Sequence, residues 1–82
     1  MKKSAAFAIL IKKLRLEHGL SGEQLAKLIN VSQQQISRYE REVTELKLAH
    51  LEKIAAAFRI DFWQFMHEAQ KIDKSDNLNP NI

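Results

Sequence analysis

The sequence contains no cysteine, two glycines and one proline among its 82 residues. Without cysteine there are no disulfides, thiolate zinc sites or cysteine nucleophiles, which fits folding in a reducing compartment. Two glycines are too few for a glycine-rich loop that cradles phosphates. The histidines at 18, 50 and 67 follow no metal-ligand spacing, and no paired-carboxylate pattern recurs. We therefore predict no metal site, no cofactor and no enzyme activity.

Long apolar runs are also missing. None approaches the roughly 20 residues that a membrane-spanning helix requires. The N-terminus resembles a secretory signal only superficially, because its apolar run, residues 5–11, ends at Lys12 and Lys13 and no small-residue cleavage site follows. The sequence therefore predicts a cytoplasmic protein with no membrane contact.

The length and the 45% apolar content suffice for one small core. Residues 1–41 carry eight basic and three acidic side chains, a net charge of +5, whereas the remainder carries −2. This asymmetry suits a surface that faces phosphates. Ordinary solvated helix faces in a mildly basic protein fit the same charge count, so the charge only supports other evidence.

Apolar residues recur at helical spacing in five segments, and no segment shows a strand pattern. The first segment ends at Gly19, a typical helix stop. Ser21 is placed to cap a second helix over residues 22–29. The predicted inward residues of these two helices are Phe7, Leu10, Ile11, Leu14, Leu25, Ala26 and Ile29.

A tight turn links the second helix to the third. Asn30 ends the second helix, since asparagine tolerates the left-handed backbone conformation that such a turn demands. Ser32 caps a third helix that runs to about Arg41. Ile36 and Tyr39 point to the core. The opposite, solvent-facing side carries Gln33, Gln34, Ser37 and Arg38.

This polar face has two interpretations. Helix propensity alone favours an ordinary hydrated surface. The position of this face in the chain favours a DNA-contacting surface. DNA-binding proteins present side chains to the major groove from the first turn of a helix that follows a short interhelical turn. Glutamine makes bidentate hydrogen bonds to adenine, as arginine does to guanine. The segment therefore indicates a DNA-binding helix-turn-helix.

The rest of the chain predicts two more helices and a tail. A loop from Glu42 to Leu46 precedes the fourth helix, and Asp61 caps the fifth. The polar sequence from Asp73 onward contains Pro80 and predicts a flexible tail over 73–82, after a domain at 1–72. The predicted inward residues are Leu48, Leu51, Ile54, Ala55 and Phe58 in the fourth helix, and Phe62, Phe65 and Met66 in the fifth.

Four segments of the sequence carry a combination of motifs: residues 11–15, 20–26, 31–41 and 51–55. Through these motifs the chain from about Phe7 to Met66 resembles the Cro and phage-repressor type of helix-turn-helix domain, the XRE family. The resemblance implies an all-α, compact, five-helix, lambda-repressor-like fold with the helix-turn-helix formed by helices 2 and 3. The segment from Ser32 to Arg41 is also similar to small regulators associated with fimbrial operons.

The resemblance also implies roles for individual residues. Double-stranded DNA is the implied partner, and base edges are contacted by Gln33, Gln34, Ser37 and Arg38. Phosphates are contacted by Lys27, Gln35 and Arg41. Arg15 and Glu40 form a partly buried ion pair that joins the first helix to the end of the third.

Three positions depart from the family pattern. Gly22 stands where many relatives have a glutamine. In those relatives the glutamine contacts a phosphate and supports the side chain at the position of Gln33, the first glutamine of the third helix. Glu42 replaces the usual glycine after that helix, and Arg59 replaces the usual glycine between the fourth and fifth helices. The first two changes predict weaker affinity for DNA, and the third puts the local turn geometry in question.

Proteins of this class generally bind DNA as dimers, so we expect a homodimer. Trp63 is the predicted interface residue, with Met66 at its edge, because an exposed tryptophan on a helix usually packs against a partner. Alternatively, Trp63 folds over the tail of its own chain. The predicted function is a sequence-specific transcriptional regulator, such as a bacterial or phage repressor. The alternative is a protein-interaction module, such as an antitoxin or antirepressor, with secondary DNA binding.

Overall fold

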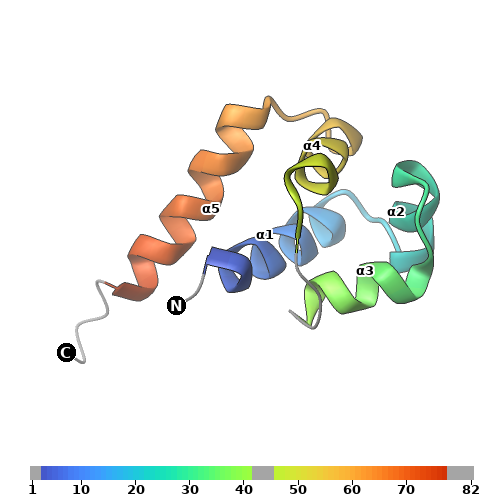
Figure 1. The fold of residues 1–82 in the computed structure, drawn as a ribbon, viewed down its shortest axis with the longest axis horizontal. Coiled ribbons are helices and arrows are strands. Elements are labelled where there is room, and N and C mark those ends of the chain that lie inside the picture. The colour runs from blue at the N-terminus through green and yellow to red at the C-terminus, as the bar shows by residue number, and fades with distance from the viewer. Residues whose placement is uncertain (1–2, 42–45, 78–82) are drawn as a thin grey trace.

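Five α-helices account for most of the chain in a computed structural model, which describes residues 3–41 and 46–77. They are α1 (Lys3–Glu17), α2 (Gly22–Ile29), α3 (Gln33–Glu40), α4 (Leu48–Ala57) and α5 (Phe62–Asn77), and those two ranges contain no strand. Helix α1 lies in the middle of the molecule, with α5 on one side and the α2–α3 pair on the other (Figure 1). The predicted all-α, five-helix architecture is confirmed.

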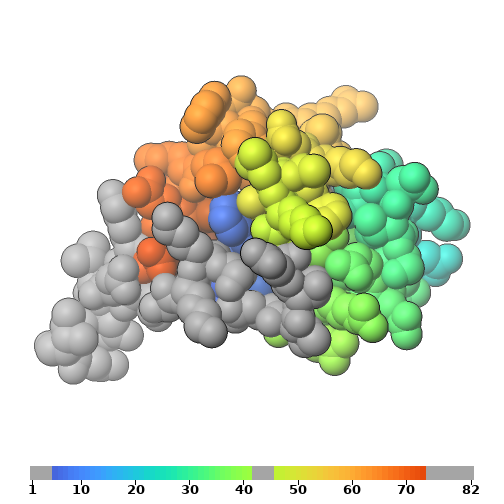
Figure 2. Space-filling view, in the orientation of Figure 1, coloured from blue at the N-terminus to red at the C-terminus, as the bar shows by residue number. Residues whose placement is uncertain are grey.

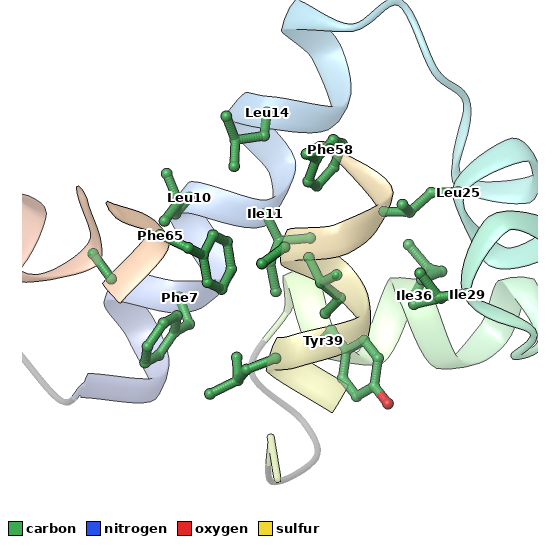
Figure 3. Packing of buried hydrophobic residues seen from close by; sticks show 14 of the residues in the cluster. Phe7, Leu10, Ile11, Leu14, Leu25, Ile29, Ile36, Tyr39, Phe58 and Phe65 are labelled. Carbon is green, nitrogen blue, oxygen red and sulfur yellow. The ribbon is translucent and has the colours of Figure 1, made fainter. Parts of the chain in front are cut away.

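All five helices contribute to a single apolar core (Figure 3). Ile11 of α1 and Ile54 of α4 are fully buried at its centre. Phe7 of α1 faces Phe65 of α5, with ring centroids 5.6 Å apart. Phe62 and Met66 are half-buried and pack against this cluster. Burial of such side chains is the main favourable term in folding, so the core fixes the relative positions of the helices.

The predicted inward faces agree with the structure at all but one position. Leu48 is 60% exposed, so its predicted place in the core is wrong. It is the first residue of α4, and the core begins one turn later, at the buried Leu51. Periodicity alone cannot show where a helix extends past the edge of its core.

Helix α5 continues through Asp73, where the predicted tail begins, and ends at Asn77. Between Asp73 and Pro80 the sequence has no proline or glycine, so nothing in the local sequence forces the helix to stop at residue 73. Residues 78–82 of the predicted tail lie outside the described residues, as do Glu42 and the three residues after it.

Helices α1, α2 and α4 end in the same way. Each is followed by a residue with positive φ: Gly19 at 66°, Asn30 at 59° and Arg59 at 56°. The amide of the next residue then bonds back to the helix, as Ile60 N does to Ala55 O at 3.0 Å. This geometry suits glycine, is tolerated by asparagine and is strained for arginine, which has a Cβ and no compensating short polar group.

Replacing Arg59 by glycine is expected to raise the free energy of unfolding by about 1 kcal/mol, because glycine adopts the left-handed conformation without steric cost. Thermal denaturation monitored by circular dichroism measures the change. Arg59→Ala is the control, since it removes the side chain but keeps the Cβ and therefore the strain. An equal gain in the alanine variant would show that strain at Cβ is not the cause.

Candidate nucleic-acid interface

Side-chain caps define the junction between α2 and α3. Ser21 and Gln24 form a reciprocal capping box at the start of α2: Gln24 N donates to Ser21 Oγ at 3.0 Å, and Ser21 N donates to Gln24 Oε1 at 2.8 Å. At the start of α3, Gln35 N donates to Ser32 Oγ at 3.1 Å. Because each cap satisfies an amide that the helix leaves unpaired, the boundaries of both helices are set locally.

One face of α3 is fixed by the core. Ile36 and Tyr39 are 1% and 0% exposed, and they belong to the same core cluster as Leu25, Ala26 and Ile29 of α2. Figure 3 shows Ile36 beside Ile29. The small side chain of Ala26 permits close approach of the two helices. Since α3 is held along its inner face, the direction of its outer face is also determined.

The outer face of α3 is polar and exposed. The four side chains predicted to contact bases all lie there, at helical positions that share one side. Helices α2 and α3 together form one end of the molecule (Figure 2). The residues of this reading face are Gln33, Gln34, Ser37 and Arg38.

The three predicted phosphate contacts flank this face in different settings. Lys27 is exposed, and its Nζ lies 3.8 Å from Glu23 Oε1. Such a surface ion pair is too weak to hold the ammonium group in place. Arg41 is exposed, and its Nε donates to the carbonyl oxygen of Ser37 at 3.3 Å. Gln35 is half-buried. The two cations are therefore at the surface, whereas Gln35 is partly enclosed by the fold.

Arg15 and Glu40 form a bidentate ion pair between α1 and the end of α3. Arg15 Nε lies 2.7 Å from Glu40 Oε2, and Nη2 lies 3.0 Å from Oε1. Arg15 Nη1 also donates to the carbonyl oxygen of Leu20 at 2.9 Å, a contact that the sequence did not predict. The hydrogen bonds to Glu40 raise the pKa of Arg15, and the charge of Glu40 adds to this effect against the opposing effect of burial. The pair ties α3 to α1.

Gly22 lies beside the outer face of α3. A Cβ at this position would lie 3.9 Å from both Gln33 Cγ and Ile36 Cγ2, which is ordinary van der Waals distance. The fold therefore tolerates a Cβ at position 22, where the family resemblance implies a glutamine.

Gly22→Gln is expected to raise affinity for DNA about fivefold, since one added hydrogen bond to a phosphate contributes about 1 kcal/mol. Fluorescence anisotropy with a labelled duplex measures the change. Gly22→Ala is the matched control, because it improves helix propensity but cannot reach a phosphate. Equal affinities for the glutamine and alanine variants would contradict this role of the missing side chain.

The predicted dimer residues lie on α5, away from the reading face (Figure 1). Trp63 is 76% exposed. The alternative prediction, in which it folds over the tail of its own chain, involves residues 78–82, which lie outside the described residues. Met66 is half-buried beside it. The exposed tryptophan is therefore available to a partner.

Residues 3–41 and 46–77 contain no group of three or more histidine, cysteine, aspartate or glutamate side chains placed to hold a metal ion. In the same ranges no helix has the length and apolar character needed to span a bilayer.

Comparison with known proteins assigns the family. A helix-turn-helix family model matches residues 11–62, which include the capped α2–α3 junction. The chain belongs to the XRE-type helix-turn-helix family. This is a family of DNA-binding transcriptional regulators rather than a class of enzymes. The narrower resemblance to regulators of fimbrial operons stays a prediction.

Two curated relatives of this helix-turn-helix chain are uncharacterised HTH-type transcriptional regulators from Rickettsia conorii and Rickettsia prowazekii. Each is 41% identical over 64 residues, which covers 74% of this chain and 51% or 49% of the relative. The chain thus spans about half the length of the curated relatives it matches.

Solved structures share the helix-turn-helix fold over nearly the whole chain. The restriction-modification controller protein C.Esp1396I has a TM-score of 0.84 at 28% identity, covering 92% of this chain and 97% of the other. The same controller protein in a nucleoprotein complex has a TM-score of 0.79 at 29% identity, covering 88% and 94%. The clp gene regulator ClgR from Corynebacterium glutamicum shares the fold, with a TM-score of 0.82 at 19% identity, covering 94% and 83%.

Proposed function

We propose that the chain is a sequence-specific transcriptional regulator that binds double-stranded operator DNA through α3. The observation that carries this proposal is the two-sided character of α3. Ile36 and Tyr39 lock its inner face into the core, while its outer face presents exposed amide and guanidinium groups. The family assignment and the nucleoprotein complex of a structural neighbour support it.

In this proposal the N-terminal part of α3 enters the major groove. Gln33 and Gln34 pair with adenine, whose N7 accepts and whose N6 amino group donates a hydrogen bond. Arg38 lies one turn beyond Gln34 on the same side and reaches a guanine or a neighbouring phosphate. Ser37 lies between Gln34 and Arg38 in the sequence, and its hydroxyl accepts or donates a hydrogen bond at a base edge. These contacts supply sequence specificity.

Phosphate contacts fix the register of α3 on the duplex. Lys27 and Arg41, at the two flanks of the reading face, are the charged members of this set, and Gln35 contributes a neutral hydrogen bond. Cations that neutralise phosphates release counterions, so their contribution falls as salt rises. The affinity for DNA and its dependence on salt should therefore be set more by Lys27 and Arg41 than by Gln35.

The proposed regulator acts as a homodimer, without cofactor, in the cytoplasm where its DNA target lies. Two α3 helices spaced by about 34 Å would enter successive major grooves on one face of the duplex. Trp63 and Met66 supply the contact between the two copies, because they lie on α5 and leave α3 free. Occupancy of the operator then blocks or assists polymerase.

Selection of bound sites from random duplex DNA at two salt concentrations tests this function. We expect enrichment of a two-fold symmetric motif with adenine-containing half-sites, and the same motif at both concentrations. Binding that enriches no motif and disappears as salt rises would indicate only non-specific attraction to phosphates.

The exposed Trp63 also favours a second function, in which this surface binds a different protein and DNA binding is secondary. Two substitutions separate the hypotheses. Gln34→Ala removes base preference and leaves a complex with a protein partner intact, whereas Trp63→Ala does the reverse.

A further inference from the structure

Two buried polar atoms lie where α3 meets α4. Tyr39 of α3 is 0% exposed, and its ring centroid lies 5.6 Å from that of His50 on α4. The Tyr39 hydroxyl points away from the other labelled core side chains (Figure 3). Tyr39 Oη and His50 Nδ1 are both buried, and neither has a hydrogen-bond partner among residues 3–41 and 46–77. Buried polar atoms without a partner destabilise a fold, because their lost hydration is not replaced.

The two atoms are chemically complementary. The phenol O–H of Tyr39 is a donor, and the unprotonated nitrogen of a neutral imidazole is an acceptor. The rings are in contact but the two atoms are not bonded, so a small shift of the imidazole relative to the phenol decides whether they meet. A hydrogen bond between them would satisfy both atoms at once.

His50 is carried by the part of α4 that the fold holds least firmly. In the described part of the chain, the side chain of the N-cap residue Lys47 makes no capping hydrogen bond. Leu48 is 60% exposed, and the core begins at Leu51. His50 N donates to Lys47 O at 3.0 Å, so the imidazole moves with this first turn. By contrast, side-chain caps are present at the starts of α2, α3 and α5. A helix end that lacks a cap and buried side chains shifts at low cost.

Cations lie on both sides of the contact between Tyr39 and His50. Arg41 is exposed and directly follows α3, whereas Lys47 is exposed and directly precedes α4. The first amides of α4 add the positive end of the helix dipole beside Lys47. A phosphate bound by Lys47 therefore acts on the first turn of α4, while Arg41 holds the end of α3 on the same duplex.

We propose that a DNA phosphate bound at Lys47 draws the first turn of α4 towards α3, so that the Tyr39 hydroxyl donates to His50 Nδ1. This proposal rests on the DNA binding proposed above and adds Lys47 to the phosphate contacts. Tyr39 and His50 are positioning residues, because they lie out of reach of the DNA and fix the end of α3 against α4. Their bond exists only in the complex and raises affinity, whereas in the free protein the same hydroxyl only destabilises the fold.

Tyr39→Phe keeps the ring and removes only the hydroxyl, so it should have opposite effects on stability and on binding. We expect the melting temperature of the free protein, followed by circular dichroism, to rise by about 4 °C, because an unpaired buried group is removed. Affinity for a labelled duplex of unselected sequence at low salt, followed by fluorescence anisotropy, should fall about fivefold. A hydroxyl with a purely structural role would not lower affinity when its removal raises stability.

His50→Phe is the second variant, because it keeps an aromatic ring beside Tyr39 and removes the acceptor. It should lower affinity by a similar factor, and the double variant Tyr39→Phe with His50→Phe should lose no more than either single variant. In a Lys47→Ala protein, Tyr39→Phe should cost no further affinity, because the contact no longer closes. Lys53→Ala, an exposed change further along α4, is the matched control and should leave the effect of Tyr39→Phe intact.

Three results would overturn the proposal. A lower or unchanged melting temperature for Tyr39→Phe would show that the hydroxyl is already paired in the free protein. An unchanged affinity would show that no bond forms on DNA. Additive losses in the double variant, or a full effect of Tyr39→Phe in the Lys47→Ala protein, would show that these residues act separately.

These outcomes are distinct from failure of the proposed function. Selection of a DNA motif by a protein that gives any of the three results leaves the proposed function standing. Opposite effects of Tyr39→Phe on stability and affinity, in a protein that selects no motif, would contradict the sequence-specific function alone.

Discussion

Arg15→Ala is expected to lower the free energy of unfolding by about 3 kcal/mol, the lower end of the range for breaking a buried ion pair. The side chains of Arg15 and Glu40 are 15% and 11% exposed, so removal of the arginine leaves a partly buried carboxylate without its ion-pair partner. The bond to the Leu20 carbonyl oxygen is lost as well. For a domain of this size the melting temperature should fall by about 12 °C or more.

The controls isolate the pair. Lys12→Ala, an exposed change on the same helix, should alter stability by less than about 0.5 kcal/mol. Arg15→Ala combined with Glu40→Ala should cost less than the sum of the single changes. A variant that kept its melting temperature but lost one base preference would show that Arg15 contacts DNA rather than supporting the fold.

The contribution of Arg15 should not depend on pH near neutrality. Its pKa is raised in the folded state, so its stabilising effect is fully present below the unfolded-state pKa and is lost only as pH rises through the folded-state value. Because an arginine titrates only in strongly alkaline solution, we expect the same difference between natural protein and Arg15→Ala at about pH 7 and about pH 9.

Gln34→Ala is expected to flatten the base preference at one or two positions of each half-site, with a loss of about 1–3 kcal/mol of discrimination. Affinity for unrelated DNA should change little, because phosphate contacts supply non-specific binding. Gln34 is exposed and makes no contribution to the core, so the melting temperature of the Gln34→Ala variant should match that of the natural protein. Competition binding against duplexes with single base changes measures the effect.

Lys27→Ala is the matched control for Gln34→Ala. It should weaken binding to all sequences alike and reduce the slope of log affinity against log salt by about one. If Gln34→Ala weakened all sequences uniformly, as a phosphate contact does, the assigned role of Gln34 in base reading would be wrong.

Most of the fold follows from local features of the sequence. Three helix caps were predictable because their side-chain oxygens accept hydrogen bonds from nearby backbone amides: Ser21, Ser32 and Asp61. Asp61 Oδ2, for example, accepts a hydrogen bond from Trp63 N at 3.0 Å. Asn30 was a predictable turn residue because few residue types adopt positive φ. These features need no knowledge of distant parts of the chain.

Features that depend on distant parts of the chain were harder to predict. The exposure of Leu48 depends on where the core ends, and the length of α5 depends on what packs along it. A single pocket is lined by Phe7 of α1 and by Trp63 and Asp73 of α5, an arrangement that no local pattern encodes. The roles of Gln33, Gln34 and Arg38 stay predictions, because exposure alone does not distinguish a reading face from a hydrated one.

A single chemical substitution in the DNA tests most directly whether α3 reads bases in the major groove. In the selected operator, the adenine assigned to Gln34 is replaced by 7-deazaadenine, which removes the N7 acceptor from the major groove and leaves Watson–Crick pairing intact. We predict an affinity loss of about tenfold for the natural protein and no further loss for Gln34→Ala, since both changes remove the same contact. Independent, additive losses would contradict the account.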